Sequence, residues 1–288
     1  MWWFILALST AFFTATGDVL TKVYLRPLGT ANMALGRVLA PIFFLLPLLL
    51  TQKWPSLDPT FWKTLFCLLP LETAALLCYM EALRVSPLSL TVPFLAFTPA
   101  FMILTGGLIL GESLHMQGII GILLIVLGSY SLHLKSLKAG WLAPIKAIFY
   151  ERGSVLMLMV AFLYSITSVL GKLAVKHSNP FFFACFYYVV HGIFATLVLG
   201  LILRVFPWRL VRKSPKGVLW VGLTQTLMVI THMWAISLAP AAYMIAVKRL
   251  SVLFGVIMGG LFFGEEDLGS RLFGAALMVI GVFLIALS

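Results

Sequence analysis

The sequence is poor in charged residues. Only 10% of its 288 residues are Asp, Glu, Lys or Arg, whereas soluble domains carry about 25%. Those 29 side chains (20 basic and 9 acidic) are too few to cover the surface of a soluble globule, and 62% of the chain is hydrophobic. Each membrane-spanning helix needs about 20 apolar residues, so ten helices would use roughly 200 positions. The composition predicts an all-α, polytopic membrane protein whose partners are the lipid bilayer and a small molecule.

Cysteine and the signals of other protein classes are also scarce. Cys67, Cys78 and Cys185 all lie in apolar stretches without metal-ligand spacing, which indicates buried thiols and predicts no metal site or cofactor. The N-terminus has no basic region and no cleavage site, so we expect it to form the first spanning helix. The net charge of +11 has no soluble fold on which to form a basic patch, which excludes nucleic-acid binding.

Apolar windows separated by turn residues predict ten spanning helices. The predicted ranges are 2–22, 31–51, 61–82, 86–110, 114–134, 153–174, 180–203, 217–238, 240–263 and 268–287. Only the connections 135–152 and 204–216 are long, and both are basic. Apart from three Lys and Arg residues deep within the spans, thirteen fall on the side of these connections. Four fall on the side of the termini: Lys53, Lys63, Lys172 and Lys176. The positive-inside rule then predicts cytoplasmic long loops and external termini, with the protein in the plasma (inner) membrane.

The chain matches itself when it is displaced by 150 to 153 residues. Val19-Leu20-Thr21-Lys22 aligns with Val169-Leu170-Gly171-Lys172, and Gly111-Glu112 aligns with Gly264-Glu265. The match predicts one five-helix repeat at 1–134, a basic connection at 135–152 and a second five-helix repeat at 153–288. Because each repeat has an odd number of helices, the second would be inverted, as in carriers that work by alternating access. A duplicated structural bundle or a channel is the alternative.

Residues 79–132 and 232–285 share a longer pattern. In each, Ala is followed by Ser-Pro or Ala-Pro, then by a helix ending in Leu-Gly-Glu or Phe-Gly-Glu, and then by a glycine-spaced helix. The pattern resembles the EamA-type repeats of the drug/metabolite transporter superfamily over nearly the whole chain. This resemblance implies a ten-helix carrier of amino acids, nucleotide-sugars, sugar phosphates or other metabolites. It also implies cytoplasmic termini, opposite to the charge bias.

The adjacent cations Lys248 and Arg249 fall inside a predicted span, about eight residues or roughly 12 Å from its start. Adjacent positions on a helix diverge by about 100°, so at least one of the two should point into the bundle. Such a pair suits a phosphate or carboxylate, or it is neutralised internally by Glu72, Asp18 or Glu81. The stretch also resembles the Lys-Arg pair that grips phosphate in plastid sugar-phosphate translocators. The first-half lysine of those carriers is replaced here by Leu95 or Ala96. Either another residue such as Arg37 supplies the second cation, or the substrate is a carboxylate that needs fewer cations.

Other polar residues within the spans complete the predicted substrate site. Glu72 and its repeat mate Gln225 would contact substrate, or Glu72 would carry a coupling proton; a salt bridge to Arg37 or Lys248 is the alternative. Two histidines, His191 and His232, would bind substrate or protons, or pack as hydrogen-bonded core residues. The aromatic candidates near these charges, each of which could instead pack or face lipid, are Tyr79, Tyr164, Tyr187, Tyr188, Trp234 and Tyr243. We predict that Pro93 and Pro99 bend or hinge their helix.

These features together predict a secondary transporter that moves a small organic phosphate or carboxylate by alternating access. An exporter of amino acids or amphipathic drugs is the alternative within transport. A membrane enzyme or lipid-linked sugar flippase is the alternative of another class, and the sequence has no catalytic motif to support the enzyme.

Overall fold

The structure is a computed structural model, and it describes residues 2–86, 92–131, 151–204, 207–263 and 268–288. The described residues form helices and no strands. In chain order these are α1 (Trp2–Leu25), η1 (Arg26–Leu28), α2 (Thr30–Leu39), α3 (Ile42–Leu50), α4 (Pro59–Val85), η2 (Val92–Ala96), α6 (Phe97–Leu110), α7 (Met116–Ser131), α9 (Arg152–Lys176), α10 (Pro180–Leu203), α11 (Pro207–Lys213), α12 (Pro215–Leu238), α13 (Ala241–Lys248), α14 (Ser251–Phe263) and α15 (Leu268–Ala286). Each of the ten predicted ranges contains one or two of these helices.

Six described segments are long and apolar enough to cross a membrane. They are Trp2–Leu28, Thr30–Leu50, Pro59–Val85, Arg152–Lys176, Pro180–Leu201 and Pro215–Leu238. Shorter apolar helices occupy Phe94–Leu110, Met116–Ser129 and Ala276–Ala286. Large side chains such as Trp2, Leu108 and Leu201 are more than three-quarters exposed. Because a bilayer solvates such side chains, these helices identify an integral, multi-pass membrane protein.

The long helices begin where the sequence supplies caps. The Asp58 carboxylate accepts a hydrogen bond from the Phe61 backbone N–H at 2.9 Å, and proline follows at the first helical position of α4. The Asn179 side chain accepts likewise from the Phe182 N–H at 2.7 Å, again just before a proline. The caps satisfy backbone donors that the helix leaves without partners, and proline loses nothing where no intrahelical bond is made.

Two of the predicted continuous spans are broken. The range 31–51 divides into α2 and α3 at Pro41, whose missing N–H ends the hydrogen-bond ladder. The range 240–263 divides into α13 and α14 at Arg249 and Leu250, where the backbone makes tight i to i−3 hydrogen bonds without any proline. The sequence prediction that Lys248 and Arg249 lie within one uninterrupted helix was therefore wrong: they lie where α13 ends.

The predicted connection 204–216 also differs from a simple loop, because it contains the short helix α11. The range 86–110 begins at Ser86, the residue that caps the end of α4, and from Val92 it continues as η2 and α6. Residues 87–91 between them, including Pro87, and most of the predicted connection 135–152 lie outside the described residues.

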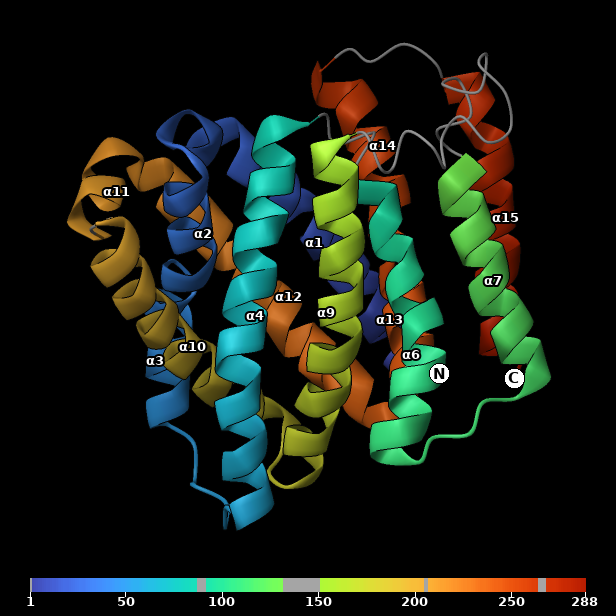
Figure 1. Cartoon of the computed structure of the whole chain (residues 1–288), viewed down its shortest axis with the longest axis horizontal. Helices are drawn as coiled ribbons and strands as arrows, with labels where there is room; N and C mark the ends of the chain where they lie inside the picture. The colour runs from blue at the N-terminus through green and yellow to red at the C-terminus, as the bar shows by residue number, and fades with distance from the viewer. Residues whose placement is uncertain (1, 87–91, 132–150, 205–206, 264–267) are drawn as a thin grey trace.

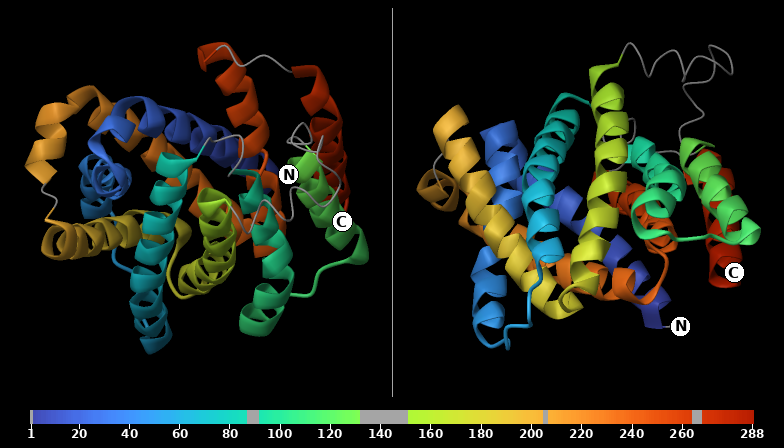
Figure 2. Two further views of the ribbon diagram at one scale, coloured as in Figure 1. Left: turned by 45° about the horizontal axis from the view of Figure 1, so that its top comes forward. Right: turned by 60° about the horizontal axis from the view of Figure 1, so that its bottom comes forward.

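Helices that are distant in sequence pack in pairs. α1 packs along α12, α4 along α9, and α7 along α15. In Figures 1 and 2, α7 and α15 lie side by side at one edge of the molecule, while α11 lies at the opposite edge. Two clusters of buried hydrophobic residues fill the interior, one including Phe183 and Met244 and the other Met33 and Met80. The candidate site lies where these clusters meet.

Candidate functional site

A cavity of about 110 Å³ opens between the two hydrophobic clusters. Residues of α1, α2, η2, α4, α9, α10, α12 and α13 line it, together with Arg249. A single buried water needs roughly 10–15 Å³ on this measure, so the cavity has room for several waters or a small organic molecule. Of the predicted site residues, it brings together Arg37, Glu72, Tyr187, His191, Gln225, His232, Lys248 and Arg249.

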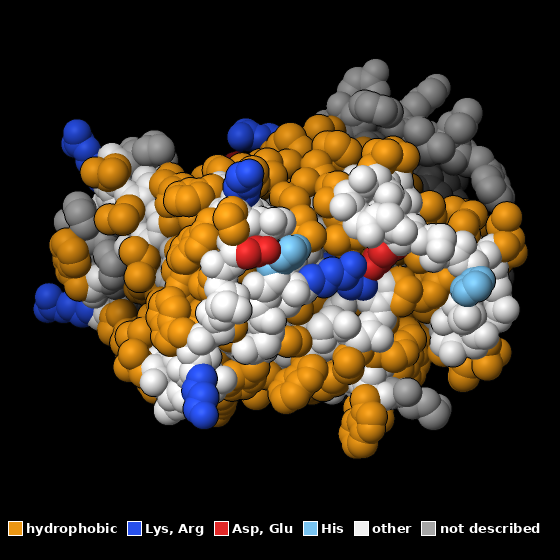
Figure 3. Space-filling model, turned by 90° about the horizontal axis from the view of Figure 1, so that it is seen from below, with side chains coloured by type: hydrophobic (Ala, Val, Ile, Leu, Met, Phe, Trp, Pro, Cys, Tyr) orange, Lys and Arg blue, Asp and Glu red, His pale blue; other side chains and the backbone are white. Residues whose placement is uncertain are grey.

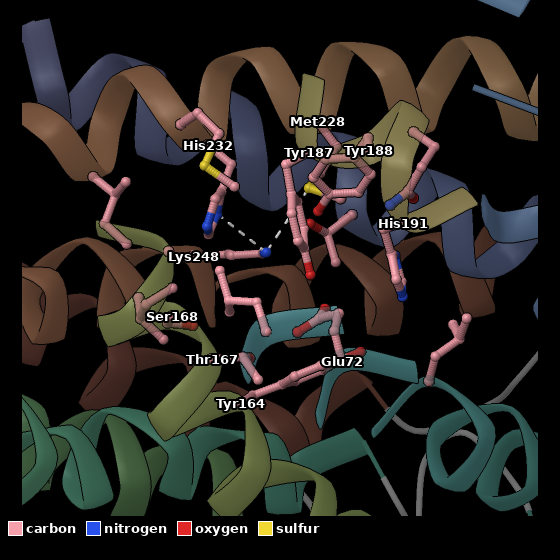
Figure 4. A pocket seen from close by; sticks show the side chains of 18 of the residues that line it. Glu72, Tyr164, Thr167, Ser168, Tyr187, Tyr188, His191, Met228, His232 and Lys248 are labelled. Atoms are coloured by element: carbon pink, nitrogen blue, oxygen red, sulfur yellow. Dashed lines mark hydrogen bonds between the residues drawn. The ribbon is translucent and has the colours of Figure 1, made fainter. Parts of the chain in front are cut away.

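Lys248 is the last residue of α13, and its ammonium reaches into the cavity (Figure 4). Its Nζ lies 3.3 Å from His232 Nδ1 and 3.8 Å from the Met228 sulfur. Within the described part of the chain, Lys248 forms no ion pair. The predicted alternative, a salt bridge to Glu72, is therefore not formed, and the ammonium is available to an anion.

Arg249 is 4% exposed and points to a different element from Lys248. Its Nη2 donates to the Thr98 hydroxyl at 2.8 Å, whereas its Nε has no hydrogen-bond partner among the residues that the structure describes. Thr98 belongs to α6, in the first half of the chain. Arg249 therefore links the two halves of the chain. Because buried polar atoms are ordinarily hydrogen-bonded, its unpartnered Nε is a donor available to a ligand in the cavity.

Arg37, which the sequence offered as the second cation for an anion, already has a carboxylate. Its Nη1 lies 2.8 Å from Asp18 Oδ1, and the Tyr79 hydroxyl donates to Asp18 Oδ2 at 2.8 Å. The Arg37 guanidinium also donates to Thr21 at 3.3 Å. The pairing is with Asp18 and not with Glu72. Since Asp18 offsets Arg37, the cavity is left with Lys248 and Arg249 against one carboxylate, Glu72.

Glu72 and Gln225 face the cavity from α4 and α12. Glu72 is half-buried and forms no ion pair within the described residues. Its carboxylate lies beside Thr167 and Tyr164 of α9 in Figure 4. Glu72 and Gln225 thus add a carboxylate and an amide to the same lining that contains Lys248 and Arg249.

Stacked rings of α10 line another wall. Tyr187 stacks on Phe183 with centroids 5.2 Å apart and on His191 with centroids 5.6 Å apart. His191 Nε2 lies 3.1 Å from the Thr73 hydroxyl, while His191 Nδ1 and the Tyr187 hydroxyl have no hydrogen-bond partner in the described part of the chain. Both side chains are at most 3% exposed. With Arg249 Nε, three unpartnered buried polar atoms therefore border one cavity, which indicates a ligand or ordered water.

Two predicted aromatic residues are not in the cavity. Trp234 is 47% exposed on α12 and its ring packs against Phe181. Tyr243 is buried in α13, and its hydroxyl accepts a hydrogen bond from the His115 backbone N–H at 3.1 Å. Sequence analysis placed both near the charges because it could not give the rotation of each helix.

Of the predicted hinge prolines, Pro99 lies beside the site and is not among the described residues that line it. Pro99 is buried in the first turn of α6, next to Thr98. Pro93 belongs to η2, and its side chain lies outside the described residues. A role as hinges remains a prediction.

The sequence analysis did not single out Thr98 or Thr167, whereas it named Tyr164 and Tyr188 as aromatic candidates. Tyr164, Thr167 and Tyr188 line the cavity, and Thr98 holds Arg249. Threonine is tolerated at any position around a spanning helix, so its presence in the sequence does not indicate whether it faces a cavity. For Thr98, the only local signal is its position directly before Pro99 in a helix of apolar residues.

No group of three or more His, Cys, Asp or Glu side chains in the described ranges could hold a metal ion. A polar cavity with an excess of cations, enclosed by apolar helices, is the arrangement of a membrane protein that binds a solute within the bilayer. The fold and the site thus define the class of a multi-pass solute-binding membrane protein.

Comparison with known proteins identifies the family. The model of the EamA-like transporter family matches residues 1–133 and 151–287. The chain belongs to this family and is a membrane transporter of the drug/metabolite transporter superfamily, not an enzyme. One similar solved structure, described only as the crystal structure of a protein, has 15% sequence identity and a TM-score of 0.66. The similarity covers 99% of this chain and 95% of that one, and at this identity it establishes the fold alone. No curated protein matches significantly.

Proposed function

We propose that this transporter carries a small organic anion, a phosphate or a carboxylate, through the cavity by alternating access. The observation that carries the proposal is the Lys248 ammonium, which reaches into the cavity without a carboxylate partner in the described residues. Arg249 adds a second charge beside it with a free Nε. A charged group in this position is costly unless it faces a polar cavity, and an anion would offset that cost.

The pairing of helices supports two inverted repeats. Under the sequence repeat, α1 corresponds to α9 and α12 to α4. The contacts α1–α12 and α9–α4 are exchanged by this correspondence, and so are α1–α14 and α9–α6. α7 and α15, the last helices of the two repeats, pack on each other. Such an exchange is expected when two halves are related by a pseudo-twofold axis, the arrangement from which carriers alternate access.

Counterflow in proteoliposomes tests the anion site. The unaltered transporter should show saturable counterflow of an organic phosphate or carboxylate. The change Lys248→Ala should raise the half-saturating concentration by at least about tenfold, because a hydrogen bond to a charged group is worth about 1.5–3 kcal/mol. Lys176→Ala is the matched control, since Lys176 is exposed at the end of α9. Equal counterflow by Lys248→Ala and the unaltered protein would remove the anion-site assignment.

Glu72 favours a second candidate, a zwitterion such as an amino acid. The Glu72 carboxylate lines the same cavity and is not used in an ion pair of the described residues. It would suit the ammonium of the substrate, while Lys248 would bind the carboxylate of the substrate. The two candidates differ in what Glu72→Gln does. It should abolish amino-acid transport and leave organic-anion transport intact or improved, because it removes only the negative charge.

A further inference from the structure

A buried ion pair near the lower end of the bundle joins the two halves of the chain. Glu112 Oε1 lies 2.5 Å from Lys172 Nζ, with the two side chains 14% and 8% exposed. The same Nζ donates to the Ala239 carbonyl at 2.5 Å, and Glu112 Oε2 accepts from the Ala241 backbone N–H at 3.0 Å. Lys172, which the charge count had placed among the surface cations, is instead held inside by two groups, the Glu112 carboxylate and the Ala239 carbonyl.

The local sequence explains why Glu112 reaches this position. Gly111 has φ of +65°, a left-handed conformation that ends α6 and turns the chain toward α7. Glu112 follows directly and meets the turn between α12 and α13. A second link is made close by, where the His115 N–H donates to the Tyr243 hydroxyl. The α6–α7 connection of the first half thus holds α9 and the α12–α13 turn of the second.

The ion pair lies directly beyond the candidate cavity. Gly171, the residue before Lys172, lines the cavity, as do Ile236 of α12 and Ile245 of α13. In Figure 1 the C-terminal ends of α6 and α9 lie together toward the bottom. Seen from below in Figure 3, charged and polar side chains gather in the middle of this end, with hydrophobic side chains around them. The three helices that Glu112 and Lys172 hold are therefore walls of the cavity.

We propose that the Glu112–Lys172 pair is the gate contact of the transporter at this end, closing the cavity here and separating when this end opens. This inference rests on the alternating-access proposal. α13 connects the gate to the substrate site, because Glu112 binds its first residue, Ala241, and its last is Lys248. Movement of α13 upon anion binding would therefore act directly on the contact.

The chemistry of the contact suits a gate better than a permanent clamp. A buried ion pair adds little net stability, because the desolvation of both charges offsets their attraction. When the end opens to water, both groups regain hydration, and the two states can be close in free energy. An apolar contact of the same size would lack this compensation, because water does not stabilise its separated surfaces.

Thiol labelling tests the gate without knowledge of the substrate. A single cysteine would be placed by Ser168→Cys, in the cavity wall one turn before Lys172, after Cys67, Cys78 and Cys185 have been replaced by alanine. A membrane-impermeant maleimide would be added from the side of the termini in proteoliposomes of known orientation. Glu112→Gln and Lys172→Met should each raise the labelling rate by about tenfold, since each removes a charge-assisted hydrogen bond from one of two states.

The variants also distinguish a gate from general damage. Lys172→Arg, which keeps the charge, should label as slowly as the unaltered transporter, and so should Lys176→Gln on the exposed turn of α9. The double variant Glu112→Gln with Lys172→Met should label no faster than either single variant, because the two residues act as one contact. Tyr243→Phe, which removes only the neighbouring hydrogen bond and alters packing least, should give an intermediate rate.

The gate assignment would be overturned if Glu112→Gln and Tyr243→Phe label at the rate of the unaltered transporter while their melting curves also match it. Additive rates in the double variant would overturn it as well. The outcome is independent of the anion assignment. Faster labelling together with unaffected counterflow in Lys248→Ala would retain the gate and reject the anion site, and the reverse result would reject only the gate.

Discussion

At the scale of single residues, two buried cations of the same kind have different surroundings. Arg37 is neutralised by Asp18, and that carboxylate is held in place by Tyr79. Arg249 has only a hydroxyl, that of Thr98, and an unpartnered Nε. Both are almost completely buried. The two arginines share a residue type and a degree of burial, and they differ in their hydrogen-bond partners. We therefore interpret Arg37 as a structural residue of the first half and Arg249 as a residue of the candidate site.

A second pair at the residue scale makes a pH-dependent link outside the membrane-spanning segments. Asp58 caps α4, and its other oxygen lies 2.7 Å from His177 Nδ1 at the end of α9. The hydrogen bond from the Phe61 N–H, together with the hydrogen bond and the electrostatic attraction of His177, lowers the pKa of Asp58 below its ordinary value of 3.8. A depressed folded-state pKa stabilises the fold above the unfolded-state value, and this contribution is lost as pH falls through the folded-state value.

We therefore expect the unaltered protein to lose melting temperature as the pH falls below about 4. Asp58→Asn, which retains a cap but not the charge, should show a smaller loss over the same interval. Thermal unfolding of the two proteins in detergent, followed by intrinsic fluorescence between about pH 3 and 6, measures both losses of melting temperature. Parallel curves for the two proteins would contradict the assignment of this pH dependence to Asp58.

At the scale of elements, α7 and α15 approach through glycine. A Cβ at Gly121 would lie 2.6 Å from the Gly281 carbonyl oxygen, and one at Gly281 would lie 2.5 Å from that of Gly121. Both neighbouring atoms belong to the backbone, so neither can move aside by changing rotamer. Small residues that allow backbones to approach are a common basis of helix association in membranes, where apolar side chains gain nothing by leaving lipid.

Gly121→Ala should accordingly destabilise the protein by about 1–3 kcal/mol, the usual cost of inserting a methyl group into packed contacts. Gly255→Ala is the matched control, since a Cβ at Gly255 in α14 meets nothing within 4 Å and alanine is the better helix former. Unfolding in mixed micelles of increasing denaturing-detergent content measures the difference. A Gly121→Ala protein as stable as Gly255→Ala would show that α7 and α15 can separate at no cost.

At the scale of the whole molecule, the charge asymmetry predicts which way the transporter faces. With Lys172 buried in its ion pair, three of the four cations counted on the side of the termini remain, Lys53, Lys63 and Lys176, against thirteen on the other side. The correction strengthens the bias toward cytoplasmic long connections and external termini.

Epitope tags test this orientation. Tags at both termini should be removed by protease added outside intact cells, whereas a tag inserted at 140 should be removed only after permeabilisation. The reverse pattern would show that the positive-inside rule is overridden here, and it would also exchange the membrane side on which the Glu112–Lys172 contact lies. The labelling experiment would still use the side of the termini, which would then be the cytoplasmic side.

The sequence by itself determined the class of fold and the family. Long apolar runs in a chain with 10% charged residues allow helices across a bilayer and little else, and the repeated Gly-Glu motif identifies the superfamily. It also singled out Lys248, Arg249, Glu72 and Arg37, because a charge within an apolar run is conspicuous without any structure. Those signals are local, and local patterns are enough to show them.

Only the tertiary structure decided which of those charges face one another. The distance from Arg37 to Asp18, the unpartnered Nε of Arg249 and the burial of Lys172 depend on helix rotation and on the packing of α1 against α12 and α4 against α9. Helices that are apolar on every side give no rotational signal, which is why Trp234 and Tyr243 were placed in the cavity in error. The break at Arg249 gave no signal in the sequence for a similar reason. It contains no proline, and the tight backbone hydrogen bonds that form there are visible only in the folded structure.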